Sequence, residues 1–513
     1  MEKRLALTIG LSLLVLLSWS ALVSKTQPVV QQEVIQKEKS NITPNIPIKE
    51  EVLLKTPIIE DTQPILFSTN KLEVAFIEKL GVVKDIGFKD YNKHKFYLNY
   101  GFMIQDPTLI FHKENSTSES IAFVHQDSNK KITKKFIFSK SGYSMRLEIV
   151  VKNLTNAPLK INLPIILGSL DFSHKNPQSR YQDVAINTQE KTFHLNAQKN
   201  KTQDGIKFIS LRDQYFCAII QPEAAGQTGF INKISNQDSE VGLISQEFVI
   251  PVGSQIGHSY EIFIGPQDLK VINSINSNWG VVIYYGTFDL ISQVLLSSLG
   301  FLHLILRNWG LAIIGLSILI YLVLYPLTLK QMKSMKEMQI LQPKVEELRQ
   351  RYKDNPQRQN KEIMQLYKEH KVNPLGGCLP LILQMPIFFA LYNALIRSVV
   401  LKGAGFLWIK DLSEPDRLFK LPVSLPILGS DFNLLPILMA IGMFVQQKIS
   451  SVHSTTGAAA EQQKIMLIVM PIVFGFIFYS MPSGLVIYWF TNSILMLVFQ
   501  LRVNQRKYVE EKH

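Results

Sequence analysis

Polar side chains inside long uncharged stretches are the residues of this chain best suited to chemistry in an apolar environment. Gln384 lies in a run from Val372 to Ile396 without any charge, long enough for a membrane-spanning helix at ~20 residues per span. Pro380 and Pro386 each remove an intrahelical hydrogen bond, and in lipid neighbouring helices must compensate for such losses. We interpret this stretch as one wall of a helical bundle that accommodates a polar guest within a bilayer. The alternative is an ordinary transmembrane helix that tolerates one glutamine.

Two more uncharged runs carry polar groups, one over 308–329 and one over 465–501. The spacing in the first run places four hydroxyl-bearing residues on one helical face: Ser317, Tyr321, Tyr325 and Thr328. The second run breaks at Pro-Ser-Gly (482–484) and then carries four residues with polar atoms: Tyr488, Trp489, Thr491 and Asn492. The simple alternative is that these groups only hydrogen-bond one helix to another.

The residue types needed for covalent chemistry are not grouped in this sequence. Lys330 adjoins a span but has no nucleophile beside it, and no glycine-rich phosphate loop with its lysine is present. The two cysteines, Cys217 and Cys378, are predicted to be buried structural thiols in different compartments. Because inverted repeats and intramembrane ionisable residues are also missing, the sequence favours neither an enzyme nor a transporter. It predicts no metal and no cofactor. The alternative functions that we keep are a secondary transporter and a polytopic membrane enzyme.

The composition favours a membrane protein. The chain of 513 residues is 46% hydrophobic and has a net charge of +13. Its basic residues stand beside the apolar spans, and neither a basic–aromatic platform nor zinc-like Cys/His spacing appears, so a membrane surface is a better partner than DNA.

The first half of the chain predicts an anchor, a linker and a β domain. Residues 1–24 contain a long uncharged run after Lys3-Arg4 and are predicted to form a retained transmembrane anchor. A cleaved signal peptide is the alternative. Residues 25–56 read as a flexible linker. Residues 57–275 form short alternating strands, such as the one containing Met145, Leu147 and Ile149, and predict a large antiparallel β-sandwich. A scaffold role is preferred there over a carbohydrate-processing one.

The second half predicts a helical membrane region. Residues 276–306 hold a connector and an interfacial amphipathic helix, with a second short span as the alternative. Residues 307–513 are expected to hold five spans: 308–329, 374–397, 431–448, 465–481 and 484–501.

A cytoplasmic helical hairpin is predicted over 330–371, where the net charge is +5. Met332, Met335 and Met338 lie on its apolar stripe, which either forms the seam between the two arms or contacts apolar segments of a partner. With the anchor, the chain has six predicted spans, both termini in the cytoplasm and the β domain outside, because basic loops favour the cytoplasmic side.

Three motifs resemble the YidC/Oxa/Alb family of membrane protein insertases. They are KVNPLGGCLPLILQMPIFFALY, QQKIMLIVMPIVFGFIFYSMPSGLVIYW and the YPLT at Tyr325–Thr328. The large domain and the ISQ at Ile291–Gln293 resemble the Gram-negative branch of that family. The resemblance implies an uncleaved first span in the bacterial inner membrane and function alone or beside the Sec translocon.

The resemblance also implies a hydrophilic groove among spans two to six, open to the cytoplasm and to lipid. The residues that we assign to this groove are Ser317, Tyr321, Gln384, Tyr488, Trp489, Thr491 and Asn492. Expected partners are nascent integral membrane proteins, membrane lipids, the Sec translocon and the ribosome. Many family members carry an arginine at the position of Tyr321, so here water, hydroxyls and amides are expected to lower the cost of bringing polar groups into the membrane.

Overall fold

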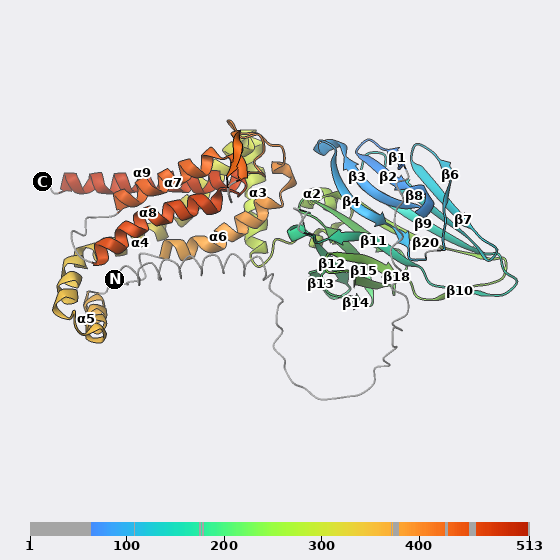
Figure 1. Ribbon diagram of the computed structural model, residues 1–513, viewed down its shortest axis with the longest axis horizontal. Coiled ribbons are helices and arrows are strands. Elements are labelled where there is room, and N and C mark those ends of the chain that lie inside the picture. The colour runs from blue at the N-terminus through green and yellow to red at the C-terminus, as the bar shows by residue number, and fades with distance from the viewer. Residues whose placement is uncertain are drawn as a thin grey trace, which may run out of the picture.

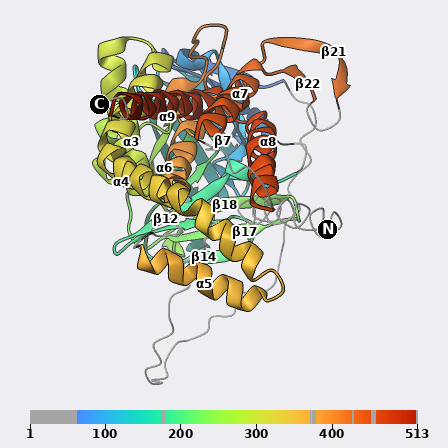
Figure 2. The ribbon, with the colours of Figure 1, turned by 90° about the vertical axis from the view of Figure 1, so that its left-hand side faces the viewer.

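A computed structural model gives the structure of the chain. It describes residues 63–106, 108–173, 176, 179–370, 372, 379–425, 429–450 and 458–510. The predicted anchor (1–24), the predicted linker (25–56) and Cys378 lie outside these residues. Figure 1 shows a β domain at one end of the described chain and a bundle of helices at the other. Figure 2 looks along the bundle from the α5 end, with the β domain behind it.

The β domain is built from antiparallel sheets, and those of nine, five and four strands are the largest within the described residues. The nine-stranded sheet has the order β13 (Thr192–Leu195), β12 (Asp183–Thr188), β15 (Ile206–Arg212), β16 (Phe216–Pro222), β20 (Gln255–Pro266), β9 (Ser144–Asn153), β8 (Lys130–Phe138), β7 (Ser120–Gln126), β6 (His112–Ser116). The five-stranded sheet has the order β14 (Lys201–Gln203), β17 (Thr228–Lys233), β18 (Asp238–Ile244), β11 (Pro164–Asp171), β5 (Met103–Ile104). The remaining strands are β1 (Ile65–Ser68), β2 (Leu72–Ile77), β3 (Val82–Phe88) and β4 (His94–Gly101) in one sheet, and β10 (Leu159–Ile161) paired with β19 (Phe248–Ile250).

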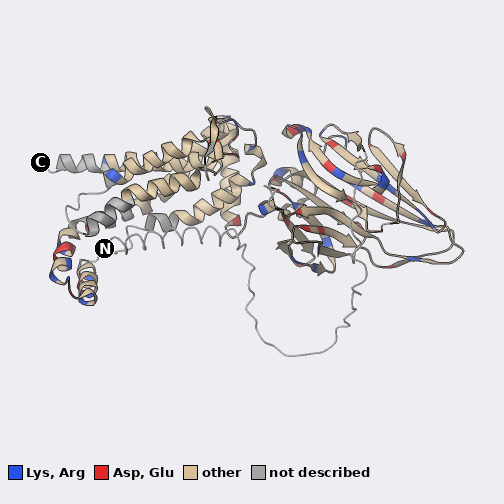
Figure 3. Cartoon of the chain, in the orientation of Figure 1, with Lys and Arg blue, Asp and Glu red and all other residues tan. Residues whose placement is uncertain are grey.

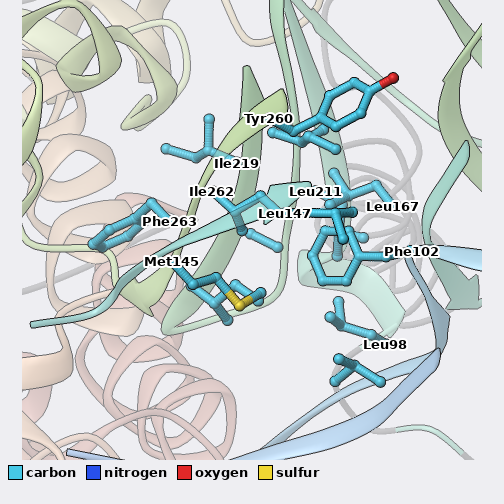
Figure 4. Close-up of a cluster of buried hydrophobic side chains, with 14 of the residues drawn as sticks. Leu98, Phe102, Met145, Leu147, Leu167, Leu211, Ile219, Tyr260, Ile262 and Phe263 are labelled. Atoms are coloured by element: carbon cyan, nitrogen blue, oxygen red, sulfur yellow. The ribbon is translucent and has the colours of Figure 1, made fainter. Parts of the chain in front are cut away.

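Side chains from different sheets meet in one apolar core. Leu147 and Leu211 of the nine-stranded sheet, Leu167 of the five-stranded sheet and Leu98 of β4 are buried in the same cluster (Figure 4). Along β9 every second side chain, including Met145 and Leu147, points into this core. The predicted β-sandwich is therefore confirmed, because alternation along each strand buries one face of each sheet.

The helices follow the β domain in the chain. Their bounds are α2 (Leu269–Ile275), α3 (Asp289–Leu306), α4 (Trp309–Arg351), α5 (Pro356–Glu369), α6 (Leu379–Ile396), α7 (Leu434–Ser450), α8 (Ala458–Phe478) and α9 (Ser483–Glu510). Short 3₁₀ turns are η1 (Glu78–Leu80), η2 (Lys89–Tyr91), η3 (Ser179–Tyr181), η4 (Ser277–Val282) and η6 (Val399–Leu401). A hairpin of β21 (Phe419–Leu425) and β22 (Gly429–Phe432) precedes α7.

Three helical segments of the described chain are long and apolar enough to cross a membrane: Asp289–Leu306, Trp309–Lys330 and Ser483–Arg502. Shorter apolar segments are Gln384–Ile396, Leu434–Ile449 and Leu467–Phe478. The predicted count of six spans is therefore not confirmed. Although Asp289–Leu306 has the length of a span, α3 runs across the end of the bundle that faces the β domain (Figure 1).

Some helices continue beyond the apolar segments that were predicted as spans. The span predicted over 308–329 and the first arm of the hairpin are one uninterrupted helix, α4, which runs through Pro326 and Pro343. α9 extends to Glu510, past the span predicted over 484–501, and α8 begins at Ala458, before the span predicted over 465–481. The Ala, Gln, Lys and Arg residues in these extensions are good helix formers, so a loss of hydrophobicity alone does not end a helix.

A buried ion network joins the β domain to the bundle. The Asp183 carboxylate on β12 accepts two hydrogen bonds from Arg212, at 2.5 and 2.7 Å. Its Oδ2 also accepts one from Arg397, just beyond α6, at 3.3 Å. Nearby, the Gln214 Nε2 donates to the Ile396 carbonyl at 2.8 Å. The domain and the bundle therefore share specific polar contacts.

Candidate functional site

The centre of the bundle holds a polar cluster of three residues from two helices. Gln384 on α6 donates a hydrogen bond from its Nε2 to the hydroxyl of Tyr488 on α9. Asn492, one turn along α9, lies beside the same tyrosine side chain. Tyr488 is fully buried in the apolar core of the bundle. The structure thus brings together three of the residues that the sequence assigned to the groove.

One polar atom on α4 and one on α9 are buried without a partner in the described part of the chain. Within the part of the chain that the structure describes, neither the Tyr321 hydroxyl on α4 nor the Asn492 Nδ2 makes a hydrogen bond. The Tyr321 ring lies 6.2 Å from that of Tyr325, which packs on Phe499 of α9 at 5.6 Å. A buried polar group without a hydrogen bond costs free energy, so both atoms are suited to bind water or a passing polar group.

Ser317 and Thr328 share the helical face of Tyr321 but have their hydroxyls occupied. Ser317 Oγ donates to the Ile313 carbonyl at 2.8 Å, and Thr328 Oγ1 to the Leu324 carbonyl at 3.1 Å. Ser317 is also fully buried. Such bonds to the preceding turn satisfy the hydroxyl within its own helix, which fits the packing alternative better than contact with a guest.

Trp489 belongs to an aromatic cluster rather than to the polar one. Its ring lies 5.4 Å from Phe388 of α6 and 5.3 Å from both Phe474 and Phe478 of α8. These contacts hold α6, α8 and α9 together beside Tyr488. Thr491 is half-buried on α9.

The charged residues of the helical region gather at its two ends. Figure 3 shows the middle of the bundle almost free of charge, with basic and acidic residues on α5 and on the last turns of α4. Met332, Met335 and Met338 lie in this part of α4, but their side chains are outside those that the structure describes. Among the described residues, no group of three or more His, Cys, Asp or Glu side chains could hold a metal ion.

Two family models and many curated proteins are similar to this chain. The model "60Kd inner membrane protein" matches residues 301–511, and "YidC periplasmic domain" matches 88–297. A membrane protein insertase YidC from Syntrophus aciditrophicus is 31% identical over 99% of this chain and 100% of its own length. The chain belongs to the YidC family of membrane protein insertases.

Other YidC proteins are similar over most of the chain. The one from Citrifermentans bemidjiense is 36% identical and covers 76% of this chain and 69% of its own length. A crystal structure of an active YidC insertase with its first transmembrane domain resolved covers 86% of this chain and 93% of its own, with 19% identity and a TM-score of 0.40. The resemblance expected from the three motifs is confirmed. In this YidC family member the first matched region covers most of the β domain and the start of α3, and the second covers the rest of α3 and the bundle.

Proposed function

We propose that this chain inserts integral membrane proteins into the bacterial inner membrane, either alone or beside the Sec translocon. The curated relatives are named insertases rather than after an enzymatic reaction. The main observation that supports a polar groove is that two buried atoms, the Tyr321 hydroxyl and the Asn492 Nδ2, have no hydrogen-bond partner among the described residues, in a bundle whose middle is almost uncharged.

The proposed groove works by replacing hydrogen bonds that a client loses when it leaves water. Moving an unpaired amide or hydroxyl into an apolar medium costs roughly 2–7 kcal/mol, depending on the reference state. Gln384, Tyr488 and Asn492 together with Tyr321 offer both donors and acceptors to water or to such a group. Because these groups are uncharged, they can serve clients with either sign of charge.

The proposed topology has six spans, with the N-terminal anchor as the first and α4, α6, α7, α8 and α9 as the others. α3 would lie in the outer interface, since it crosses the bundle end next to the β domain (Figure 1). The basic end of α4, together with α5, would lie in the cytoplasm, where Lys and Arg are enriched in short loops. The β domain would then be periplasmic.

The hairpin formed by the end of α4 and α5 is the proposed entry point for nascent chains. Residues 330–371 have a net charge of +5, which suits anionic lipid headgroups or ribosomal RNA. Met332, Met335 and Met338 would offer adaptable apolar contacts to the client. The client would pass from this hairpin to the groove along α4.

A triple substitution tests the groove. Gln384→Leu, Tyr488→Phe and Asn492→Leu together remove the polar cluster while keeping comparable side-chain volumes. We expect insertion of a small single-span client, measured by protease protection in proteoliposomes, to fall at least about tenfold, because losing one polar contact of 1.4 kcal/mol already gives that factor.

The matched control is Ser493→Ala, also on α9, whose hydroxyl donates to the Trp489 carbonyl of its own helix at 3.1 Å. This variant should insert the client at the normal rate. Full protection of the client by a folded triple variant would show that the cluster only packs helices, and the groove proposal would fail.

A further inference from the structure

A cavity of about 350 Å³ opens between the β domain and the adjoining end of the bundle. The β domain contributes Arg180, Tyr181 and Tyr215 to its lining, and the bundle side contributes Tyr392, Lys402 and Met481. Tyr215 also hydrogen-bonds across the junction to Ser413, at 3.2 Å between the two hydroxyl oxygens. The cavity is thus assembled only when the domain and the bundle are together.

The lining carries excess positive charge. Three cations, Arg180, Lys402 and Arg417, and one carboxylate, Glu414, line the cavity, so the lining has a formal charge of +2. Arg417 is neutralised, since it pairs with Glu414 at 2.6 Å and with Asp431 at 3.2 Å. Arg180 and Lys402 have no ion pair within the described chain, and each lies over a tyrosine ring, at 4.7 Å from Tyr181 and 4.4 Å from Tyr215.

A second source of positive charge lies directly behind the lining. The ion network of Asp183, Arg212 and Arg397 holds two guanidinium groups against one carboxylate and so has a net charge of +1. The Arg397 guanidinium carbon lies 6.0 Å from the centre of the Tyr181 ring, and its Nη1 is buried without a partner in the described part of the chain.

Asp213 and Asp411 already have hydrogen-bond donors and form no ion pair with Arg180 or Lys402 within the described chain, although the charge of Lys402 does act on Asp213. Asp213 accepts the backbone N–H groups of Tyr215 and Phe216, both at 2.7 Å, and burial raises its pKa to about 6. Asp411 accepts from the backbone and the hydroxyl of Ser413, at 2.8 and 2.7 Å. An anion that enters the cavity therefore meets two available cations.

We propose that this cavity binds a phosphate group. An arginine fork and a lysine ammonium are the side chains that most often hold phosphate oxygens, and tyrosine hydroxyls can add neutral donors. Ile396 and Met481 give the cavity an apolar edge on the bundle side. Two sources carry this chemistry: the headgroup of an anionic phospholipid and a small soluble phosphate.

Binding to the full-length protein in a neutral detergent separates the two sources. The probes are a short-chain phosphatidylglycerol, a short-chain phosphatidylcholine, glycerol phosphate and inorganic phosphate. Native mass spectrometry counts the bound probe, and the thermal unfolding midpoint reports its affinity, because a ligand that binds only the folded state raises it. Preference for phosphatidylglycerol over glycerol phosphate identifies a lipid site, whereas equal affinity identifies a soluble phosphate.

The decisive variant is Arg180→Gln with Lys402→Gln. We expect it to bind the preferred probe about tenfold more weakly or worse, because it removes both charged donors that are free to hold phosphate oxygens. The control is Lys160→Gln with Lys410→Gln, which removes two exposed cations, one on each side of the junction and both outside the cavity. Unchanged binding in the Arg180/Lys402 variant, an equal loss in the control, or no binding of any probe to the native protein would each overturn the proposal.

Discussion

The Tyr321 hydroxyl is a polar atom whose burial is not compensated by the folded chain. Its ring contributes to packing against Tyr325, but its oxygen has no hydrogen-bond partner within the described residues. Removing such an atom does not break any bond in the protein, so its effect on stability and its effect on function can be separated.

We therefore expect Tyr321→Phe to leave the thermal unfolding midpoint unchanged or slightly higher, while client insertion falls. The reason is that phenylalanine keeps the ring and removes only the group available to water or client. Thermal unfolding in detergent and protease protection in proteoliposomes measure the two effects. The contrasting variant is Tyr479→Phe, which removes a hydroxyl that donates to the Asp431 carbonyl at 2.8 Å.

Tyr479→Phe should lower stability, because it leaves the Asp431 carbonyl and the Asn433 amide without this partner. A Tyr321→Phe protein that inserts normally would remove this hydroxyl from the groove proposal. A Tyr321→Phe protein that unfolds as early as Tyr479→Phe would show that the hydroxyl is structurally bonded.

The groove residues stay a prediction, and their pairings could not be obtained from the sequence. Gln384 and Tyr488 were both assigned to the groove, yet they are 104 residues apart and belong to helices that are apolar on nearly every side. Without a polar face, the rotation of such a helix about its axis cannot be inferred from periodicity. Ser317 was assigned from its helical face, but spacing does not show that its hydroxyl bonds the preceding turn.

At the scale of elements, close contact between α7 and α8 depends on a small residue. A Cβ added at Gly475 on α8 would lie 3.1 Å from the Cβ of Ala440 on α7. Helices in membranes associate through such small residues, because these allow backbones to approach and increase dispersion contacts. The narrow gap leaves no room for a larger side chain.

Gly475→Leu should destabilise the bundle by about 1–3 kcal/mol, the usual cost of overfilling a packed interface. The control is Gly300→Leu on α3, where an added Cβ has nothing within 4 Å. Both changes replace a helical glycine with leucine, so the gain in helix propensity cancels between them. If the two variants unfold at the same temperature in detergent, α7 and α8 do not pack closely at Gly475.

The sequence predicts strands better than helix ends in this protein. The alternation of Met145, Leu147 and Ile149 predicted a strand, which the structure contains as β9, paired with β8 from the Phe138–Met145 pair onward. A strand with one buried and one exposed face has apolar and polar residues that alternate in the sequence. The end of α4 has no comparable sequence signal, because the helix continues through Pro343 and through the change from apolar to charged residues.

At the scale of the whole molecule, one carboxylate joins the β domain to the bundle. Asp183 contacts both Arg212 of its own domain and Arg397 beyond α6, although Asp183 and Arg397 are 214 residues apart. That separation is the reason why sequence reasoning missed the contact. The two arginines also differ, since Arg212 makes a bidentate pair and donates to the Val282 carbonyl at 2.7 Å.

We expect Asp183→Asn to destabilise the junction far more than Arg397→Gln. The first change leaves two buried guanidinium groups facing each other, and such a loss costs about 3–5 kcal/mol. The second change leaves the neutral Arg212–Asp183 pair intact. Hydrogen exchange of β12 and β15 in the full-length protein measures the difference, and faster exchange in Arg397→Gln than in Asp183→Asn would contradict this account.

The continuity of α4 has a mechanical consequence. A helix from Trp309 to Arg351 is a stiff rod about 65 Å long at a rise of about 1.5 Å per residue. The arm beyond Lys330 accounts for about 32 Å of it, so a tilt of about 10° within the bundle moves the tip by about 6 Å. Pro326 and Pro343 each remove one hydrogen bond and are the points where the rod bends most easily. A force on α5 is therefore transmitted along one continuous helix, through the two proline positions, to Tyr321.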